Sequence, residues 1–303
     1  MKTWLSLVLL LGASHAWACP CSDDAGSAAG LVRTDERYAV ALVATSRRAL
    51  GRFDALGRYS ALDRAEGEAS EELLLRAGLR LPQRVEWLGE LGYASYRLHA
   101  PGFVEQQAGI GDAILHARYA LLDQGMPHAE RLVGLGLSAL VRAPLGNLAA
   151  GRESSFGSGG AQLGLGAWEV GAGLELKRAV LPELELLLGG EAAYRFADHV
   201  LEVERKLGPR ADVALGAKVL PSAWLSTSLS LRARFTGDVA LSGRRLDGTA
   251  ERLWSVVAGA AVFERRSRLR SSLTLSVDPP LGALSQGSTA AAALSVALGY
   301  GVD

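Results

Sequence analysis

The feature that most constrains the fold is an alternation of apolar and polar side chains that recurs along most of the chain. Segment 225–236 shows it most clearly, with Leu, Thr, Ala and Phe on one face and only Ser, Arg and Thr on the other. A period of two residues predicts β-strands that have an apolar medium on one side and a polar medium on the other.

The same pattern predicts about 12 strands, most of them longer than the roughly 9–11 residues that cross a bilayer on a tilt. The expected strands are 36–48, 70–82, 84–98, 109–122, 131–144, 162–177, 183–197, 207–220, 223–236, 251–264, 268–278 and 290–301. A sheet that spans a membrane must close on itself, because unpaired backbone groups at an edge are too costly in lipid. The chain is therefore predicted to be all-β, an antiparallel transmembrane β-barrel.

The connections between these strands alternate between long and short. The long ones are 49–69, 99–108, 145–161, 198–206, 237–250 and 279–289. The short ones lie near Pro82-Gln83, at 123–130, at 178–182, near Pro221-Ser222 and at 265–267. Long loops outside and short turns on the periplasmic side are typical of up-and-down outer-membrane barrels. The order of lengths predicts that both termini lie in the periplasm.

Residues 1–18 have the pattern of a secretory signal peptide. Lys2 gives a positive start, Leu5 to Leu11 form an apolar run, and Ala16-Trp17-Ala18 is a small-x-small cleavage site. The apolar run is shorter than the roughly 20 residues of a membrane-spanning helix. We therefore expect export of the chain and cleavage after Ala18.

The mature chain is expected to consist of a periplasmic tail, 19–35, and a barrel, 36–303. The tail begins with Cys19-Pro20-Cys21. In an oxidising compartment two such thiols are able to pair, to bridge to another molecule or to bind a soft metal. Lipidation of Cys19 is a further alternative, and an incidental pair in a flexible tail is the favoured interpretation.

Charge gives no support for nucleic-acid binding. The chain has 32 basic and 32 acidic residues, and loss of Lys2 with the leader leaves a net charge of −1. Nucleic-acid binding domains instead carry a clear basic excess.

Charged side chains occur in the middle of the expected strands, always opposite the apolar set. A charge on the lipid face costs about 2–4 kcal/mol at the bilayer midplane, so these side chains are predicted to line the lumen. The candidates are Arg76, Arg80, Glu86, Glu90, Asp112, His116, Arg118, Arg142, Glu169, Glu175, Lys177, Glu185, Glu191, Arg195, Asp212, Lys218, Arg232, Arg234 and Arg270. Their mixed signs fit either a narrow wet pore or a barrel filled by ion pairs.

No set of residues predicts catalysis, a metal site or a cofactor. The histidines after the leader are His99, His116, His128 and His199. His116 shares a face with Asp112, but no serine lies on that strand to complete a nucleophilic site. The carboxylate pair Glu86 and Glu90 is expected to face arginines across the barrel. We therefore expect a protein that is not an enzyme.

One strand resembles the signature of a known family. Gly109-Ile110-Gly111-Asp112, followed by Arg118-Tyr119, is similar to the Gly-x-Gly-Asp…(Lys/Arg)-Tyr strand of the outer-membrane family labelled phenol-degradation meta-pathway proteins. Ala143-Pro144-Leu145-Gly146 is similar to the apolar-Pro-x-Gly turn that ends a later strand in that family. The resemblance is confined to residues 109–146 and implies an outer-membrane channel or transporter.

These observations favour a passive channel in the outer membrane of a Gram-negative bacterium, for small solutes that include aromatic or amphipathic molecules. The main alternative is a closed structural or recognition barrel that acts through the loops 49–69 and 145–161, and an outer-membrane enzyme is the least favoured. The expected partners are outer-membrane lipid, a small-molecule solute and the barrel-assembly machinery, for which Tyr300 is the candidate C-terminal aromatic signal. The pattern specifies no oligomeric state.

Overall fold

The chain forms a closed antiparallel β-barrel of 12 strands, as predicted. The computed structural model describes residues 36–62, 67–82, 84–100, 103–122, 133–145, 166–181, 183–200, 203–222, 224–264, 267–281 and 284–302. The wall strands are β1 (Tyr38–Phe53), β3 (Gly67–Arg80), β4 (Val85–Ala100), β6 (Ala113–Leu122), β7 (Val133–Ala143), β8 (Glu169–Leu181), β9 (Leu184–Arg195), β12 (Arg210–Ser222), β13 (Leu225–Thr236), β16 (Glu251–Glu264), β17 (Leu269–Val277) and β18 (Thr289–Val302).

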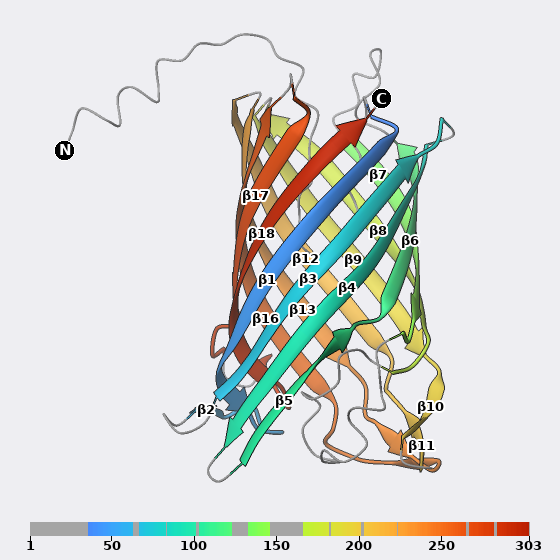
Figure 1. Cartoon of the computed structure of the whole chain (residues 1–303), viewed down its shortest axis with the longest axis vertical. Coiled ribbons are helices and arrows are strands. Elements are labelled where there is room, and N and C mark those ends of the chain that lie inside the picture. The colour runs from blue at the N-terminus through green and yellow to red at the C-terminus, as the bar shows by residue number, and fades with distance from the viewer. Residues whose placement is uncertain are drawn as a thin grey trace, which may run out of the picture.

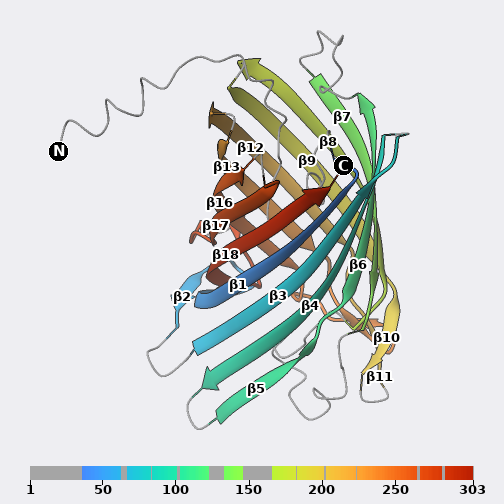
Figure 2. The ribbon, with the colours of Figure 1, turned by 45° about the horizontal axis from the view of Figure 1, so that its top comes forward.

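The barrel closes where the last strand pairs with the first. β1 and β18 are antiparallel from Tyr38↔Val302 to Arg52↔Thr289, and every other wall strand pairs with its neighbours along the chain. The strands are tilted around a single interior (Figures 1 and 2). The start of β1 and the end of β18 lie at one end, which we call the proximal end, and the opposite end is the distal end.

The outer face of the wall is apolar. Leucines at its middle are about half exposed, for example Leu42, Leu229 and Leu273. Exposed aromatic side chains flank this band at both ends. Those near the proximal end are Tyr38, Trp87, Tyr119, Trp224 and Tyr300, and those near the distal end are Trp168, Tyr194, Phe196 and Phe235. An apolar band between two aromatic girdles is the outer surface of a transmembrane barrel.

The signature Gly109–Asp112 lies at a break between two strands, whereas the sequence predicted one strand over 109–122 after a loop at 99–108. β5 (Phe103–Ile110) pairs with the distal half of β4, and β6 pairs with its proximal half. Gly109 is paired within β5, and Gly111 lies at the break, where its N–H donates to the carbonyl of Gly92 at 2.8 Å. The kink directs the carboxylate of Asp112 inward, with its side chain 1% exposed.

The strand predicted at 162–177 starts and ends too early in the sequence. In the structure β8 runs over 169–181, because its pairing with β9 continues to Leu181↔Leu184 at a tight turn. The prediction began too early because the glycine-rich stretch before residue 169 continues the alternating pattern. Residues 162–165 lie outside the described part of the chain.

Two of the expected long loops form a small sheet at the distal end. β10 (Ala197–Val200), β11 (Val203–Lys206), β14 (Ala240–Leu241) and β15 (Arg244–Arg245) pair in that order. An ion pair stabilises each hairpin, Arg205 with Asp198 in the first and Arg245 with Asp238 in the second. The hydrogen bonds that Arg245 donates lower the pKa of Asp238 below its ordinary value. The two connections therefore extend the barrel beyond its rim (Figure 1).

Among the described residues, no helix is long and apolar enough to span a membrane. The expected signal peptide, 1–18, and tail, 19–35, lie outside the described residues and stay predictions. The same holds for the sidedness of the barrel.

Candidate functional site

Charged side chains on the inner face are concentrated on β4 to β12. Several are buried although ionisable, with exposed fractions of 0% for Glu169, 3% for Lys218 and 5% for Glu86. Buried charges are tolerable only when they are paired and hydrogen-bonded. The burial of these side chains therefore depends on the ion pairs that they form.

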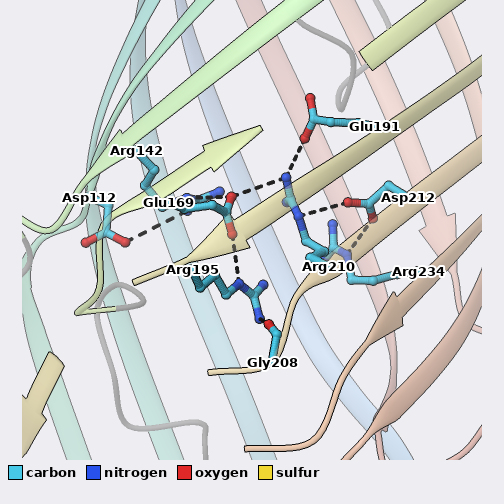
Figure 3. Close-up of polar contacts among 9 residues, drawn as sticks. All are labelled: Asp112, Arg142, Glu169, Glu191, Arg195, Gly208, Arg210, Asp212 and Arg234. Carbon is cyan, nitrogen blue, oxygen red and sulfur yellow. Dashed lines mark hydrogen bonds and ion pairs between the residues drawn. The ribbon is translucent and has the colours of Figure 1, made fainter. Parts of the chain in front are cut away.

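A group that we call the distal cluster surrounds Glu169 (Figure 3). Its carboxylate lies 2.8 Å from Arg195 Nε, 3.2 Å from Arg210 Nη2 and 3.6 Å from Arg142 Nε. Three arginines thus surround one carboxylate that has no exposed surface. The complete cluster is Asp112, Arg142, Glu169, Glu191, Arg195, Arg210, Asp212 and Arg234.

Strand register produces the distal cluster. Arg142, Glu169 and Arg195 are direct cross-strand neighbours on β7, β8 and β9. Opposite charges at directly opposed positions attract each other, so this register is favoured over its alternatives. A second row of neighbours consists of Glu191, Asp212 and Arg234. Arg210 joins the two rows through its ion pairs, and Asp112 adds to the first row through Arg142. Acidic and basic side chains occur in equal numbers, so the cluster as a whole is neutral.

A second group, the proximal cluster, lies nearer the termini and consists of Glu86, Arg118, Glu175 and Lys177. Arg118 lies 3.7 Å from Glu86 and 3.3 Å from Glu175, and Lys177 lies 2.6 Å from Glu175. Arg118 reaches Glu175 across β7 at Gly136, where an added Cβ would come within 3.2 Å of the guanidinium. The glycine therefore provides the space for this bridge between non-adjacent strands.

Further ion pairs lie near the seam where the barrel closes. Arg270 on β17 pairs with Glu36, just before β1, and both side chains are at most 5% exposed. Arg76 lies 3.1 Å from Glu90, and Arg47 lies 3.8 Å from Asp278. The Glu36 pair joins residues that are 234 positions apart.

The structure brings most of the candidate residues into contact with one another. Candidates found in ion pairs are Arg76, Glu86, Glu90, Asp112, Arg118, Arg142, Glu169, Glu175, Lys177, Glu191, Arg195, Asp212, Arg234 and Arg270. Glu185 and Lys218 are buried cross-strand neighbours. The remaining candidates are Arg80, which lies directly opposite Glu86 across β3 and β4, Arg232 on β13 and His116 on β6. His116 is partly buried, and its Nδ1 has no hydrogen-bond partner among the described residues.

Sequence reasoning missed Glu36, Arg47, Arg210 and Asp278. Arg210 carried a usable signal, because it lies two residues before Asp212 and therefore shares its face. The other three lie at or beside the ends of expected strands, Glu36 and Arg47 in 36–48 and Asp278 in 268–278. Their ion-pair partners lie on other strands, so only the three-dimensional pairing identifies them.

The described residues contain no group of three or more His, Cys, Asp or Glu that is arranged to hold a metal ion. The described interior is instead lined by ion-paired acidic and basic side chains.

Two solved structures with similar folds place this barrel among known proteins. One is an outer membrane channel from Pseudomonas putida F1, with a TM-score of 0.69 and 13% identity over 90% of this chain and 98% of that chain. The other is the NanC porin, with a TM-score of 0.50 and 7% identity over 86% and 100%. No protein-family model and no curated protein matches the sequence. At these identities the likeness establishes the fold, and the chain has the barrel fold of outer-membrane channels and porins.

Proposed function

We propose that this protein is an outer-membrane channel for the passive passage of small solutes. The observation that carries the proposal is the pairing of a largely apolar outer band with a polar, charge-lined interior in one closed barrel. Lipid covers the first surface and water wets the second, which is the arrangement of a transmembrane pore. The similarity of the fold to channels rather than to enzymes supports this role.

The lengths of the connections support one sidedness of the barrel in the membrane. The proximal end carries the short turns, and the distal end carries the long connections with the sheet of β10, β11, β14 and β15. Long loops of outer-membrane barrels face outward. The proposal therefore places both termini in the periplasm and the small sheet outside the cell.

The proposed solutes are small amphipathic or aromatic molecules. Acidic and basic groups in the two clusters neutralise each other, so the interior does not concentrate one sign of ion as a single-sign ring does. The likeness of Gly109–Asp112 to the phenol-degradation meta-pathway family supports the role of a channel or transporter.

A closed structural barrel is the second candidate, and the dense burial around Glu169 favours it. Ion pairs that fill an interior also serve as a plug. A barrel with about 8 strands is filled by side chains, and one with about 16–18 leaves a channel, so 12 strands are compatible with either outcome.

Liposome swelling separates the two candidates. Vesicles that contain the purified protein are diluted into isotonic sugars, amino acids or aromatic acids of increasing size, beside protein-free vesicles. A channel gives swelling that falls with solute size. Swelling equal to that of protein-free vesicles for every solute would leave the structural barrel as the better account.

Ion selectivity tests whether the inner arginines line the path. Arg232 and Arg234 lie on the inner face of β13, and the side chain of Arg234 is 55% exposed. Replacing both by glutamate changes four units of charge, so the reversal potential in a salt gradient should shift toward cation selectivity. An unchanged reversal potential would show that these side chains are remote from the ion path.

A further inference from the structure

The inner face of the barrel has a second half that differs from the charged one. On β13, β16, β17, β18 and β1 the inward side chains at mid-wall are small, mostly Ser, Thr, Ala and Gly. Long Arg, Lys and Glu side chains on β4 to β12 extend into the interior from the opposite side. Free space in the lumen is therefore expected beside the small residues rather than at its centre.

One set of directly opposed positions places hydroxyl groups across this half. Ser228, Gly259, Thr274, Ser295 and Thr45 are consecutive cross-strand neighbours on β13, β16, β17, β18 and β1, and we call them the hydroxyl row. The hydroxyls of Thr45 and Ser295 lie 2.9 Å apart. An added Cβ at Gly259 would lie 2.9 Å from Ser228 Oγ and 3.6 Å from Thr274 Oγ1.

The hydroxyl row extends along the passage as well as around it. Neighbouring strands are about 4.8 Å apart, so the four steps from Ser228 to Thr45 cover about 19 Å. Strands of such barrels tilt by about 40°, and a row at right angles to them therefore advances by about 12 Å along the axis. This distance is close to half of the roughly 25 Å apolar band of a transmembrane barrel.

A cavity lies at the centre of the row. It has a volume of about 40 Å³, and its lining includes Ser272, Thr274, Ser295, Ala297 and Gly299. Thr274 itself is only 7% exposed. Its hydroxyl is a polar group in the wall of this cavity, where it is able to donate a hydrogen bond to an entering molecule or accept one from it.

The charges around the cavity are already offset. Arg76 and Arg270 also line it, but Arg76 pairs with Glu90 and Arg270 pairs with Glu36. An entering ion would therefore find no uncompensated charge of opposite sign. A neutral molecule needs none, and a serine or threonine hydroxyl both donates and accepts.

We propose that the solute path is eccentric, that it follows the hydroxyl row, and that Thr274 and its neighbours bind small uncharged solutes that carry hydroxyl or carbonyl groups. This inference rests on the proposed channel function. Repeated weak hydrogen bonds let a solute enter and leave, which conduction requires. The methyl and methylene surfaces of Ala297, Ala41 and Gly299 provide the apolar side of the path.

Single cysteines locate the path. The chain has two cysteines, Cys19 and Cys21, which are replaced by serine in the full-length background. Ser295→Cys lies in the hydroxyl row, Ser138→Cys on the inner face of β7 in the charged half, and Thr227→Cys on the outer face of β13. Each variant reacts with benzyl methanethiosulfonate, the extent of labelling is measured by mass spectrometry, and erythritol flux is measured by liposome swelling.

Labelled Ser295→Cys should lose most of its erythritol flux and regain it when a reductant removes the label, and the other two variants should keep theirs. The inference is overturned if Ser295→Cys does not label, if full labelling leaves flux unchanged, or if Ser138→Cys blocks as strongly. Channel failure gives a different result, because unlabelled protein would then pass neither erythritol nor ions.

Thr274→Val tests the solute class, because it removes the hydroxyl and keeps the shape. Loss of one neutral hydrogen bond predicts a two- to tenfold lower erythritol flux, with potassium chloride conductance unchanged. Thr227→Val on the outer face of β13 is the matched control and should change neither. Equal losses of erythritol flux and ion conductance in Thr274→Val would contradict a hydrogen-bonding role.

Discussion

Replacement of Glu169 by glutamine should destabilise the barrel strongly. The carboxylate is fully buried and contacts Arg195, Arg210 and Arg142 at 2.8, 3.2 and 3.6 Å. Glutamine keeps the shape and one acceptor but removes the charge, which leaves three guanidiniums around a neutral group. Breaking a buried pair by removing one partner costs about 3–5 kcal/mol. At 1.4 kcal/mol per factor of ten, the unfolding equilibrium should shift by roughly 100-fold to several thousand-fold.

The free energy of unfolding is measurable by urea titration in lipid vesicles, followed by tryptophan fluorescence. Glu71→Gln is a matched control, because Glu71 and its partner Arg48 are both more than 60% exposed. Exposed pairs contribute about 0.2–1 kcal/mol, so this variant should unfold almost as the parent does.

A second substitution tests the cause of the loss. Glu169→Gln combined with Arg195→Met restores equal numbers of acidic and basic groups, and it should recover part of the lost stability. The reasoning is refuted if Glu169→Gln costs no more than Glu71→Gln, or if the double variant is less stable than the single one by the full cost of a second buried group.

Three further outcomes follow from other parts of the structure. Leu229→Arg, on the lipid face, should lower the free energy of unfolding by about 2–4 kcal/mol in the same titration, and a loss below 1 kcal/mol would mean that lipid does not cover this face. The hydrogen bonds that Arg245 donates lower the pKa of Asp238 below its ordinary value of 3.8. This pairing therefore stabilises the distal hairpin fully at pH values above 3.8, and the stabilisation is lost as the pH falls through the lower pKa of the folded state. Pepsin cleavage within 237–250 should therefore rise as the pH is lowered below that value in the parent, and cleavage in Asp238→Asn should be high at every pH tested. Gly301→Ala should displace Glu36, because the added Cβ would overlap its Oε1, and a lowered unfolding midpoint in heat-modifiability gels would report the lost contact.

The strands were predictable because burial on one face leaves a period of two in the sequence. β13 (Leu225–Thr236) coincides with the segment in which the alternation is cleanest. The β5–β6 break was not predictable, since Gly109–Asp112 continues the alternation through a kink that depends on pairing with β4.

Which charges meet was harder to predict than which face they share. The row Arg142, Glu169 and Arg195 depends on the register between β7 and β8, and the long connection between those strands does not fix it. The pair of Glu36 and Arg270 joins the two ends of the chain and exists only because the barrel closes. The local sequence pattern therefore predicts which side chains point inward, whereas strand register and barrel closure determine which of them form ion pairs.

The central claim is that the barrel is an open channel. Single-channel recording in planar lipid bilayers tests it most directly, because each insertion of an open barrel raises the current by one step. The account predicts discrete steps whose size grows with salt concentration and which are absent from protein-free detergent controls. Folded protein that inserts and gives no steps from low to molar salt would contradict the channel and support a closed barrel.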